Sequence, residues 1–231
     1  MAQMQMRWPP VTLEIKIIAG VLFGLWFGSL MVPALGDLVG TQLLVSAVAV
    51  SEGRVWTVLT YAFFHADFMH LLFNCGVLWL FGGELSAKWS AKKWWGFNLA
   101  CALGGGVAVV GSQFVLGVAH PTLGYSGAVM GVVAAFAWEN WDRRLYLFFV
   151  PMTGKTLLLV FIAFDVLLVV VGREPISIAA HLGGLVTGLL LATGWWRPTK
   201  WKRSVKRYRQ RRRFKVIRRE AEAEQNRRYL N

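Results

Sequence analysis

The chain has 231 residues, of which 56% are hydrophobic and only 16% are charged, and its mean hydropathy is +0.48. This composition is too apolar and too poor in charge for an ordinary soluble domain, and it indicates a membrane protein. The net charge of +13 is concentrated in residues 197–231, which hold 15 Lys/Arg and 3 acidic residues. Cys75 and Cys101 both lie in apolar runs and are expected to be free thiols.

The apolar stretches predict six membrane-spanning helices. A spanning helix needs about 20 apolar residues. The 45 residues from 94 to 138 contain no charge, which is too long for one helix and suits two, with a turn at 117–124. The other predicted spans are 17–36, 68–83, 155–171 and 176–196. The predicted fold is an all-α, six-transmembrane-helix bundle (17–196), preceded by a short segment (1–16) and followed by a basic tail (197–231).

The basic residues predict the orientation of this bundle. With six spans both termini share one side, and eight of the ten Lys/Arg outside the tail fall on that side. Only Arg54 and Arg173 lie opposite. Because cytoplasmic segments are enriched in Lys and Arg, both termini are predicted to be cytoplasmic, in a bacterial inner membrane. A cleaved N-terminal leader is the alternative to a retained first span.

Two segments outside the spans are predicted to contact the membrane surface. The uncharged run 38–51 is too short to span, so it is expected in the interface or against the bundle. The tail from Arg197 mixes basic residues with Trp201 and Tyr208, and it is expected to bind anionic lipid. RNA or ribosome binding is the weaker alternative, and nucleic acid is not an expected partner.

Four polar residues interrupt the predicted spans at one depth. The second, fourth and sixth spans all run inward from the external side, so their first turns share a layer. Ser126 begins the fourth span, and His70 and Asn74 lie on one face of the second. His181 lies about five residues, or roughly 8 Å, into the sixth. Polar groups at this depth need partners or a function, and together they indicate an intramembrane serine hydrolase.

Small residues predict that the fourth and sixth spans touch. A GxxxG pattern occupies 127–131 directly after Ser126, and another occupies 184–188 soon after His181. Glycines at this spacing let helix backbones approach closely. Close contact would bring the Ser126 hydroxyl within hydrogen-bond reach of the His181 imidazole, which is the geometry that a nucleophile and its base require.

Each of these residues also has a purely structural interpretation. A serine in a small-residue helix often packs or bonds to the preceding turn, and an intramembrane His or Asn can join helices. His120, in the turn before Ser126, is a weaker candidate for the base. Asp165 is the obvious candidate to orient His181. By residue count, however, we place it well below the outer layer, so we predict a hydrogen bond within the bundle and a Ser–His dyad.

Three short runs contain the residues discussed above. They are His65-Ala-Asp-Phe-Met-His70-Leu-Leu-Phe-Asn74, then Gly124-Tyr125-Ser126-Gly127, and finally Ala180-His181-Leu-Gly-Gly184. The first resembles the second-helix motif of the rhomboid family of intramembrane serine proteases, the second its nucleophile motif, and the third its sixth-helix motif. The motifs occur in the family's order, and the resemblance covers about residues 10–196.

The resemblance implies a role for each residue. Ser126 would be the nucleophile and His181 the general base. Backbone N–H groups of Ser126 and Gly127, with the side chains of His70 and Asn74, would form the oxyanion hole, which the dipole of the helix also favours. Met130 stands where many relatives have an aromatic residue that packs on the base. The residues expected to support the site structurally are His65, Gly124, Met130, Gly131, Gly184 and Gly188.

The predicted function is therefore endopeptidase cleavage of single-span membrane proteins near the outer membrane face. Lateral entry of the substrate beside the fifth helix and the loop 172–175 is implied by the resemblance. No metal or cofactor is expected, because the sequence contains no His-Glu metal motif. The alternatives are a catalytically silent, rhomboid-like protein that binds or escorts membrane clients, and, less favoured, a small-solute transporter.

Overall fold

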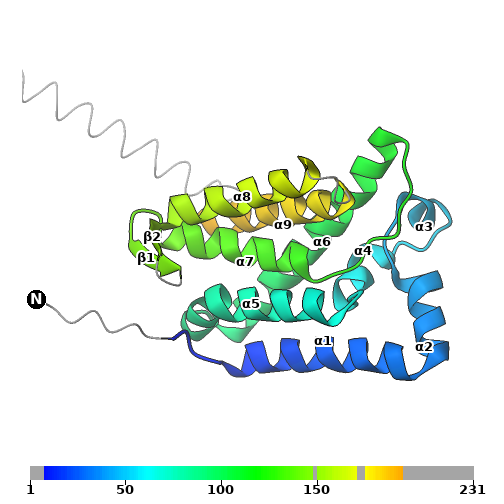
Figure 1. The fold of residues 1–231 in the computed structure, drawn as a ribbon, viewed down its shortest axis with the longest axis horizontal. Coiled ribbons are helices and arrows are strands. Elements are labelled where there is room, and N and C mark those ends of the chain that lie inside the picture. Colours follow the sequence, from blue (N-terminus) through cyan, green and yellow to red (C-terminus); the bar gives the residue numbers. More distant parts are fainter. Residues whose placement is uncertain (1–7, 148–149, 171–174, 195–231) are drawn as a thin grey trace, which may run out of the picture. The chain divides into compact units, whose positions relative to one another are not determined.

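The described part of the chain is a bundle of helices with one short β-hairpin (Figure 1). The computed structural model describes residues 8–147, 150–170 and 175–194. The α-helices are α1 (Leu13–Met31), α2 (Pro33–Leu38), α3 (Ala47–Ser51), α4 (Thr57–Thr60), α5 (Phe68–Lys88), α6 (Ala91–Leu116), α7 (Ser126–Glu139), α8 (Gly154–Val170) and α9 (Pro175–Thr193). The π-helix η1 covers Val39–Leu43 and the 3₁₀-helix η2 covers Tyr61–Phe63. Strands β1 (Arg144–Leu147) and β2 (Val150–Thr153) pair antiparallel between α7 and α8.

Among the described residues, three helices are long and apolar enough to cross a membrane, namely α1, α5 and α6. Helix α7 and residues 178–193 of α9 are shorter apolar helices. The prediction of a helical membrane protein is confirmed. The count of six spans remains a prediction, and so does the basic tail, which lies outside the described residues.

The long helices expose most of their apolar surface. Other parts of the protein bury only 17% of the apolar window of α1, 39% of that of α5 and 33% of that of α6. Large exposed side chains include Phe23, Phe27, Phe73, Leu99 and Val107. So large an apolar surface is incompatible with water, since soluble helices keep a polar outer face. Lipid is the solvent in which these helices are stable.

The observed bounds differ from the predicted spans by five residues at two helix ends. Helix α1 stops at Met31 instead of continuing to residue 36, because Pro33 starts α2 after a break at Val32. Helix α5 continues past residue 83 to Lys88, whose ammonium group donates to the Glu84 carboxylate at 2.6 Å. The β-hairpin was not predicted. Both cysteines are free thiols, as expected.

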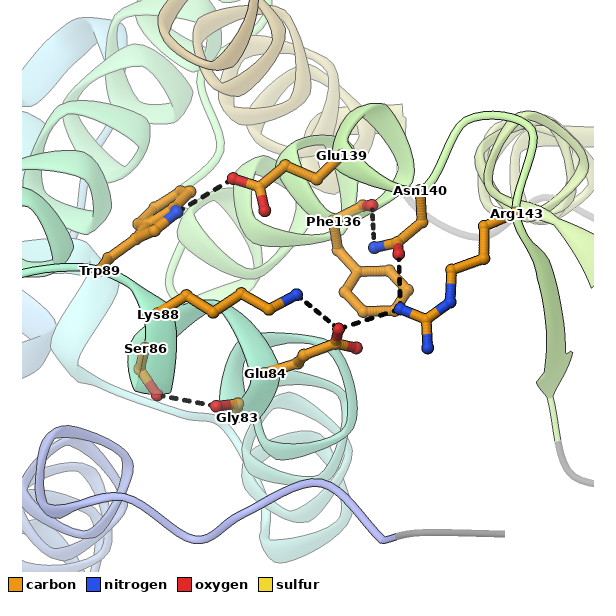
Figure 2. Close-up of polar contacts among 9 residues, drawn as sticks. All are labelled: Gly83, Glu84, Ser86, Lys88, Trp89, Phe136, Glu139, Asn140 and Arg143. Atoms are coloured by element: carbon orange, nitrogen blue, oxygen red, sulfur yellow. Dashed lines mark hydrogen bonds and ion pairs between the residues drawn. The ribbon is translucent and has the colours of Figure 1, made fainter. Parts of the chain in front are cut away.

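Polar contacts join the C-terminal ends of α5 and α7 (Figure 2). Glu84 accepts hydrogen bonds from Lys88 and from Arg143, the latter at 3.1 Å. The Trp89 indole N–H donates to Glu139 at 3.0 Å. These groups are largely exposed, so each pair adds little stability. Together they align two parallel helices whose opposite ends contain His70 and Ser126.

Glycines bring α7 and α9 into backbone contact. A Cβ added at Gly184 would overlap the carbonyl oxygen of Gly127, and one added at Gly188 would lie 2.5 Å from the carbonyl oxygen of Gly131. The contact predicted between the fourth and sixth spans is therefore present. No side chain separates the two backbones at these positions, so any added methyl group must push them apart.

Replacing Gly184 with alanine should lower the free energy of unfolding by roughly 1–3 kcal/mol, because the new methyl group overpacks a backbone contact. Gly111→Ala in α6 is the matched control, since a Cβ there meets nothing within 4 Å. The control should leave stability unchanged or raise it by up to about 1 kcal/mol. Unfolding of both variants in detergent measures the difference, and equal stabilities would contradict the packing described here.

Candidate active site

The first turns of α5 and α7 meet at Gly124. Ser126 is the first residue of α7, and Tyr125 before it makes no side-chain capping bond, so the first N–H groups of α7 remain available to a ligand. In α5 the Asp67 carboxylate accepts from the His70 N–H at 2.8 Å. A Cβ at Gly124 would lie 2.8 Å from His70 Nε2 and 3.7 Å from Ser126 Oγ. Glycine, with a φ of +126° here, therefore leaves room for the imidazole beside the hydroxyl.

His181 reaches the same region from α9. The carbonyl oxygen of Ala180 lies 3.1 Å from the position of a Cβ on Gly127. Ser126 precedes Gly127 and His181 follows Ala180, so the two backbones touch one residue away from the predicted nucleophile and the predicted base. Both residues are half-buried. Among the described residues no hydrogen bond joins the two side chains, and such bonds are often long before a substrate binds.

Asp165 contacts His181, so our prediction of its depth is wrong. Its Oδ1 lies 2.8 Å from His181 Nδ1. Helix α8 ends on the side of the membrane where α9 begins, so the depth of Asp165 must be counted back from Val170. Five residues of helix are about 8 Å, which is the depth we assigned to His181. The carboxylate is buried, and within the described residues its Oδ2 has no hydrogen-bond partner.

His65 and Asn74 form a buried pair beside His70. Asn74 Nδ2 lies 3.0 Å from His65 Nε2, and the Tyr125 backbone N–H donates to the same nitrogen at 3.4 Å. Because a backbone N–H can only donate, Nε2 is the acceptor, and the neutral ring carries its proton on Nδ1. The rings of His65 and His70 meet edge to face, with centroids 5.0 Å apart. His65 thus connects α5 to the residue before Ser126, and it engages the amide predicted to bind an oxyanion.

Gln113 holds the loop that leads to Ser126, and the sequence analysis missed it. Its Oε1 accepts from the Ala47 N–H at 2.7 Å, and its Nε2 donates to the His120 carbonyl oxygen at 2.7 Å. The His120 side chain itself is exposed. The sequence does contain a sign of this role, because a glutamine near the end of an apolar helix must find hydrogen-bond partners once it is buried.

Met130 is buried one turn below Ser126, among apolar side chains of α7, α8 and α9. Its cluster includes Leu158 and Leu185, and the latter lies one turn after His181. A flexible thioether can fill the irregular space between three helices. The structure therefore places Met130 where it supports the contact of α7 with α9.

These features define a class of protein, a helical membrane protein in which a serine at a helix N-terminus lies beside a histidine of a neighbouring helix. The family model for the rhomboid domain matches residues 52–198. The chain belongs to the rhomboid family.

Relatives of the chain come from mitochondria and from a bacterium. "RHOMBOID-like protein 12, mitochondrial" of Arabidopsis thaliana is 29% identical over 158 residues, which cover 62% of this chain and 47% of the relative. "Rhomboid protein 1, mitochondrial" of Saccharomyces cerevisiae is 30% identical over 139 residues, covering 58% and 40%. "Putative rhomboid protease YdcA" of Bacillus subtilis is 28% identical over 145 residues, covering 63% and 69%. The chain thus spans less than half the length of the two mitochondrial relatives.

His65 should make stability depend on pH. Burial, and secondarily the nearby His70, lower its pKa from 6.5 to about 3, while Asp67 opposes the shift. Between these two values the unfolded chain binds more protons than the folded protein. Stability should therefore fall as the pH falls from about 6.5 towards 3, by up to about 1.4 kcal/mol per pH unit.

Unfolding of the wild type and of His65→Gln between pH 7 and 4.5 isolates this contribution, because the other titrating groups are common to both. Glutamine can still accept from the Tyr125 N–H but does not titrate. We expect the unfolding temperature of the wild type to fall more steeply than that of the variant. Parallel curves would show that His65 is not held neutral by burial.

Proposed function

We propose that this protein is an intramembrane serine endopeptidase with Ser126 as nucleophile and His181 as general base. His181 would accept the Ser126 proton as the hydroxyl oxygen attacks a substrate carbonyl carbon. Later it would return that proton to the leaving amine. No metal or cofactor is required for this chemistry, since an activated hydroxyl and an imidazole suffice.

The observation on which this proposal rests is the backbone contact of Gly127 with Ala180. Gly127 follows Ser126 and Ala180 precedes His181, so this contact supports the proposed pairing of the hydroxyl with the imidazole. Polar side chains inside a membrane domain are costly, and they usually line a functional site. Membership of the rhomboid family, which includes intramembrane serine proteases, supports the same proposal.

The proposed oxyanion hole lies at the start of α7. Its uncapped first-turn N–H groups, including those of Ser126 and Gly127, carry the positive end of the helix dipole. The His70 ring lies beside Ser126 at Gly124 and can contribute a further donor. Asn74 has a second amide hydrogen besides the one directed at His65. Donors of this kind stabilise a developing negative charge by several kcal/mol.

The proposed substrates are single-span membrane proteins, cleaved near the outer membrane face. Ser126 lies at the start of its helix, so the site is shallow, and the substrate helix must unwind to expose a peptide bond. Segments with glycine or proline unwind at the lowest cost. We further propose that the basic tail binds anionic lipid and that both termini are cytoplasmic in a bacterial inner membrane. Residues 172–174 of the proposed gate lie outside the described residues.

Ser126→Ala should abolish cleavage of a reporter transmembrane segment while the protein still inserts and expresses. Ser112→Ala in α6 is the matched control, because within the described part of the chain that hydroxyl bonds to its own helix, at the Val109 carbonyl. Immunoblotting of the reporter in membranes measures cleavage. Persistence of cleavage would refute the assigned nucleophile. Binding of the reporter by a wild type that never cleaves it would instead favour the client-binding alternative.

A fluorophosphonate probe tests the base separately, since an activated serine displaces fluoride and forms an O–P bond with the probe. Ser126 should be labelled in the wild type. His181→Ala should slow labelling by about 100-fold or more, the usual contribution of a general base. His120→Ala is the control, because its exposed ring should not matter. Labelling at the wild-type rate in His181→Ala would remove His181 as the base.

A further inference from the structure

Asp165 and His181 form a polar contact between α8 and α9. The distance from Asp165 Oδ1 to His181 Nδ1 is 2.8 Å, which is typical of a charge-assisted hydrogen bond. Asp165 is 4% exposed, and its second oxygen is buried without a partner among the described residues. A carboxylate in such a place costs free energy, because an apolar surrounding does not solvate it. If Asp165 served only to pack α8 against α9, an amide or an apolar residue would serve as well.

The contact determines which nitrogen of His181 can act as a base. An ionised carboxylate only accepts hydrogen bonds, so Nδ1 must carry the proton in this pair. The free electron pair of the neutral ring is then on Nε2, at the opposite side of the imidazole from Asp165. This is the tautomer that a general base needs when its other nitrogen is held by a carboxylate.

We propose that Asp165 is a positioning residue for His181, so that the site operates as a Ser126–His181–Asp165 triad. This inference rests on the proposed role of His181 as the base. When the Ser126 oxygen bonds to the substrate carbon, its proton moves to His181 Nε2 and the carbonyl electron pair moves to the oxyanion. Asp165 keeps Nδ1–H oriented and stabilises the imidazolium, and it takes no proton itself.

The other titratable groups around His181 do not duplicate this role. His70 on α5 lies within electrostatic range of His181, but it is an imidazole, and its ring contacts that of His65. From η2 the Tyr61 hydroxyl approaches Gly127 and donates to the Ala102 carbonyl oxygen. The charged residues of α6 and α7 lie at the far ends of those helices: Lys92, Lys93 and Glu139. In the described part of the chain, Asp165 is the acid that bonds to His181.

The test is the rate of fluorophosphonate labelling as a function of pH in Asp165→Asn. Asparagine keeps the size of the side chain but removes the negative charge. We expect labelling to slow by at least about tenfold, short of the roughly 10⁴-fold lost when the aspartate of a trypsin-type triad is changed to asparagine. The midpoint of the pH–rate profile should move to lower pH, because an imidazolium formed at His181 loses its counter-charge. Asp165→Glu should restore part of the rate.

Thr187→Val is the matched control on α9, because it removes a hydrogen bond to Gly183 in the same helix without touching His181. It should leave both the labelling rate and the midpoint unchanged. A structural role for Asp165 would lower the unfolding temperature without moving the midpoint. Wild-type rate and midpoint in Asp165→Asn, with labelling lost in Ser126→Ala, would overturn the triad alone. Labelling that survives in Ser126→Ala would instead overturn the proposed function.

A second measurement needs no variant at position 165 and therefore covers the case in which Asp165→Asn fails to fold. Histidine labelled with ¹⁵N in the wild type reports the tautomer of His181, which a His181→Gln spectrum assigns. We expect protonated Nδ1 and unprotonated Nε2 in the neutral ring. A neutral ring with its proton on Nε2 would refute the orientation by Asp165.

Discussion

The close approach of α7 and α9 is the constraint on which the site depends. A side chain as short as serine reaches a neighbouring helix most readily where the two backbones lie close together, and glycines at 127, 131, 184 and 188 allow that close approach. Helix α6 joins the same contact, because a Cβ at Gly105 would lie 2.9 Å from the carbonyl oxygen of Ala180. In lipid no hydrophobic force drives helices together, so close backbone packing is one of the few sources of cohesion available. The packing that stabilises the bundle is thus the packing that positions Ser126 and His181.

Several buried polar groups in this bundle form hydrogen bonds that link helices. His65 bonds to Asn74 and to the Tyr125 N–H, and the Tyr125 hydroxyl donates to Asn98 at 3.1 Å. These bonds hold both sides of the residue that precedes Ser126. The ion pairs at the other end of α5 and α7 differ in kind, since they are exposed and contribute mainly alignment (Figure 2). The hydrogen bonds of His65 and Tyr125 fix the backbone next to Ser126. The ion pairs keep α5 and α7 parallel at their opposite ends.

Much of this arrangement could be predicted from the sequence, because it follows from local patterns. Uncharged runs predict the helices, and parallel spans with polar first turns predict the shared layer of His70 and Ser126. The partner of His181 could not be predicted in the same way. Helix α8 runs opposite to α9, so the depth of Asp165 is correct only when it is counted from the outer end of α8, and the residue count used for the prediction did not start from that end. The hairpin of β1 and β2 also has no apolar periodicity that separates it from a loop.

The antiparallel course of α8 also gives a physical reason for a carboxylate beside the proposed base His181. The first turns of α5 and α7 carry partial positive charge, which suits an oxyanion but opposes an imidazolium nearby. The C-terminal turn of α8 carries partial negative charge, yet Asp165 lies five residues before Val170, and the effect of a helix dipole fades within the last turn. The Asp165 carboxylate, whose Oδ1 lies 2.8 Å from His181 Nδ1, would therefore stabilise the imidazolium, which the dipole of α8 cannot do. On this argument the two ionic species formed during attack would be stabilised by separate devices, the oxyanion by helix N-termini and the imidazolium by one buried acid.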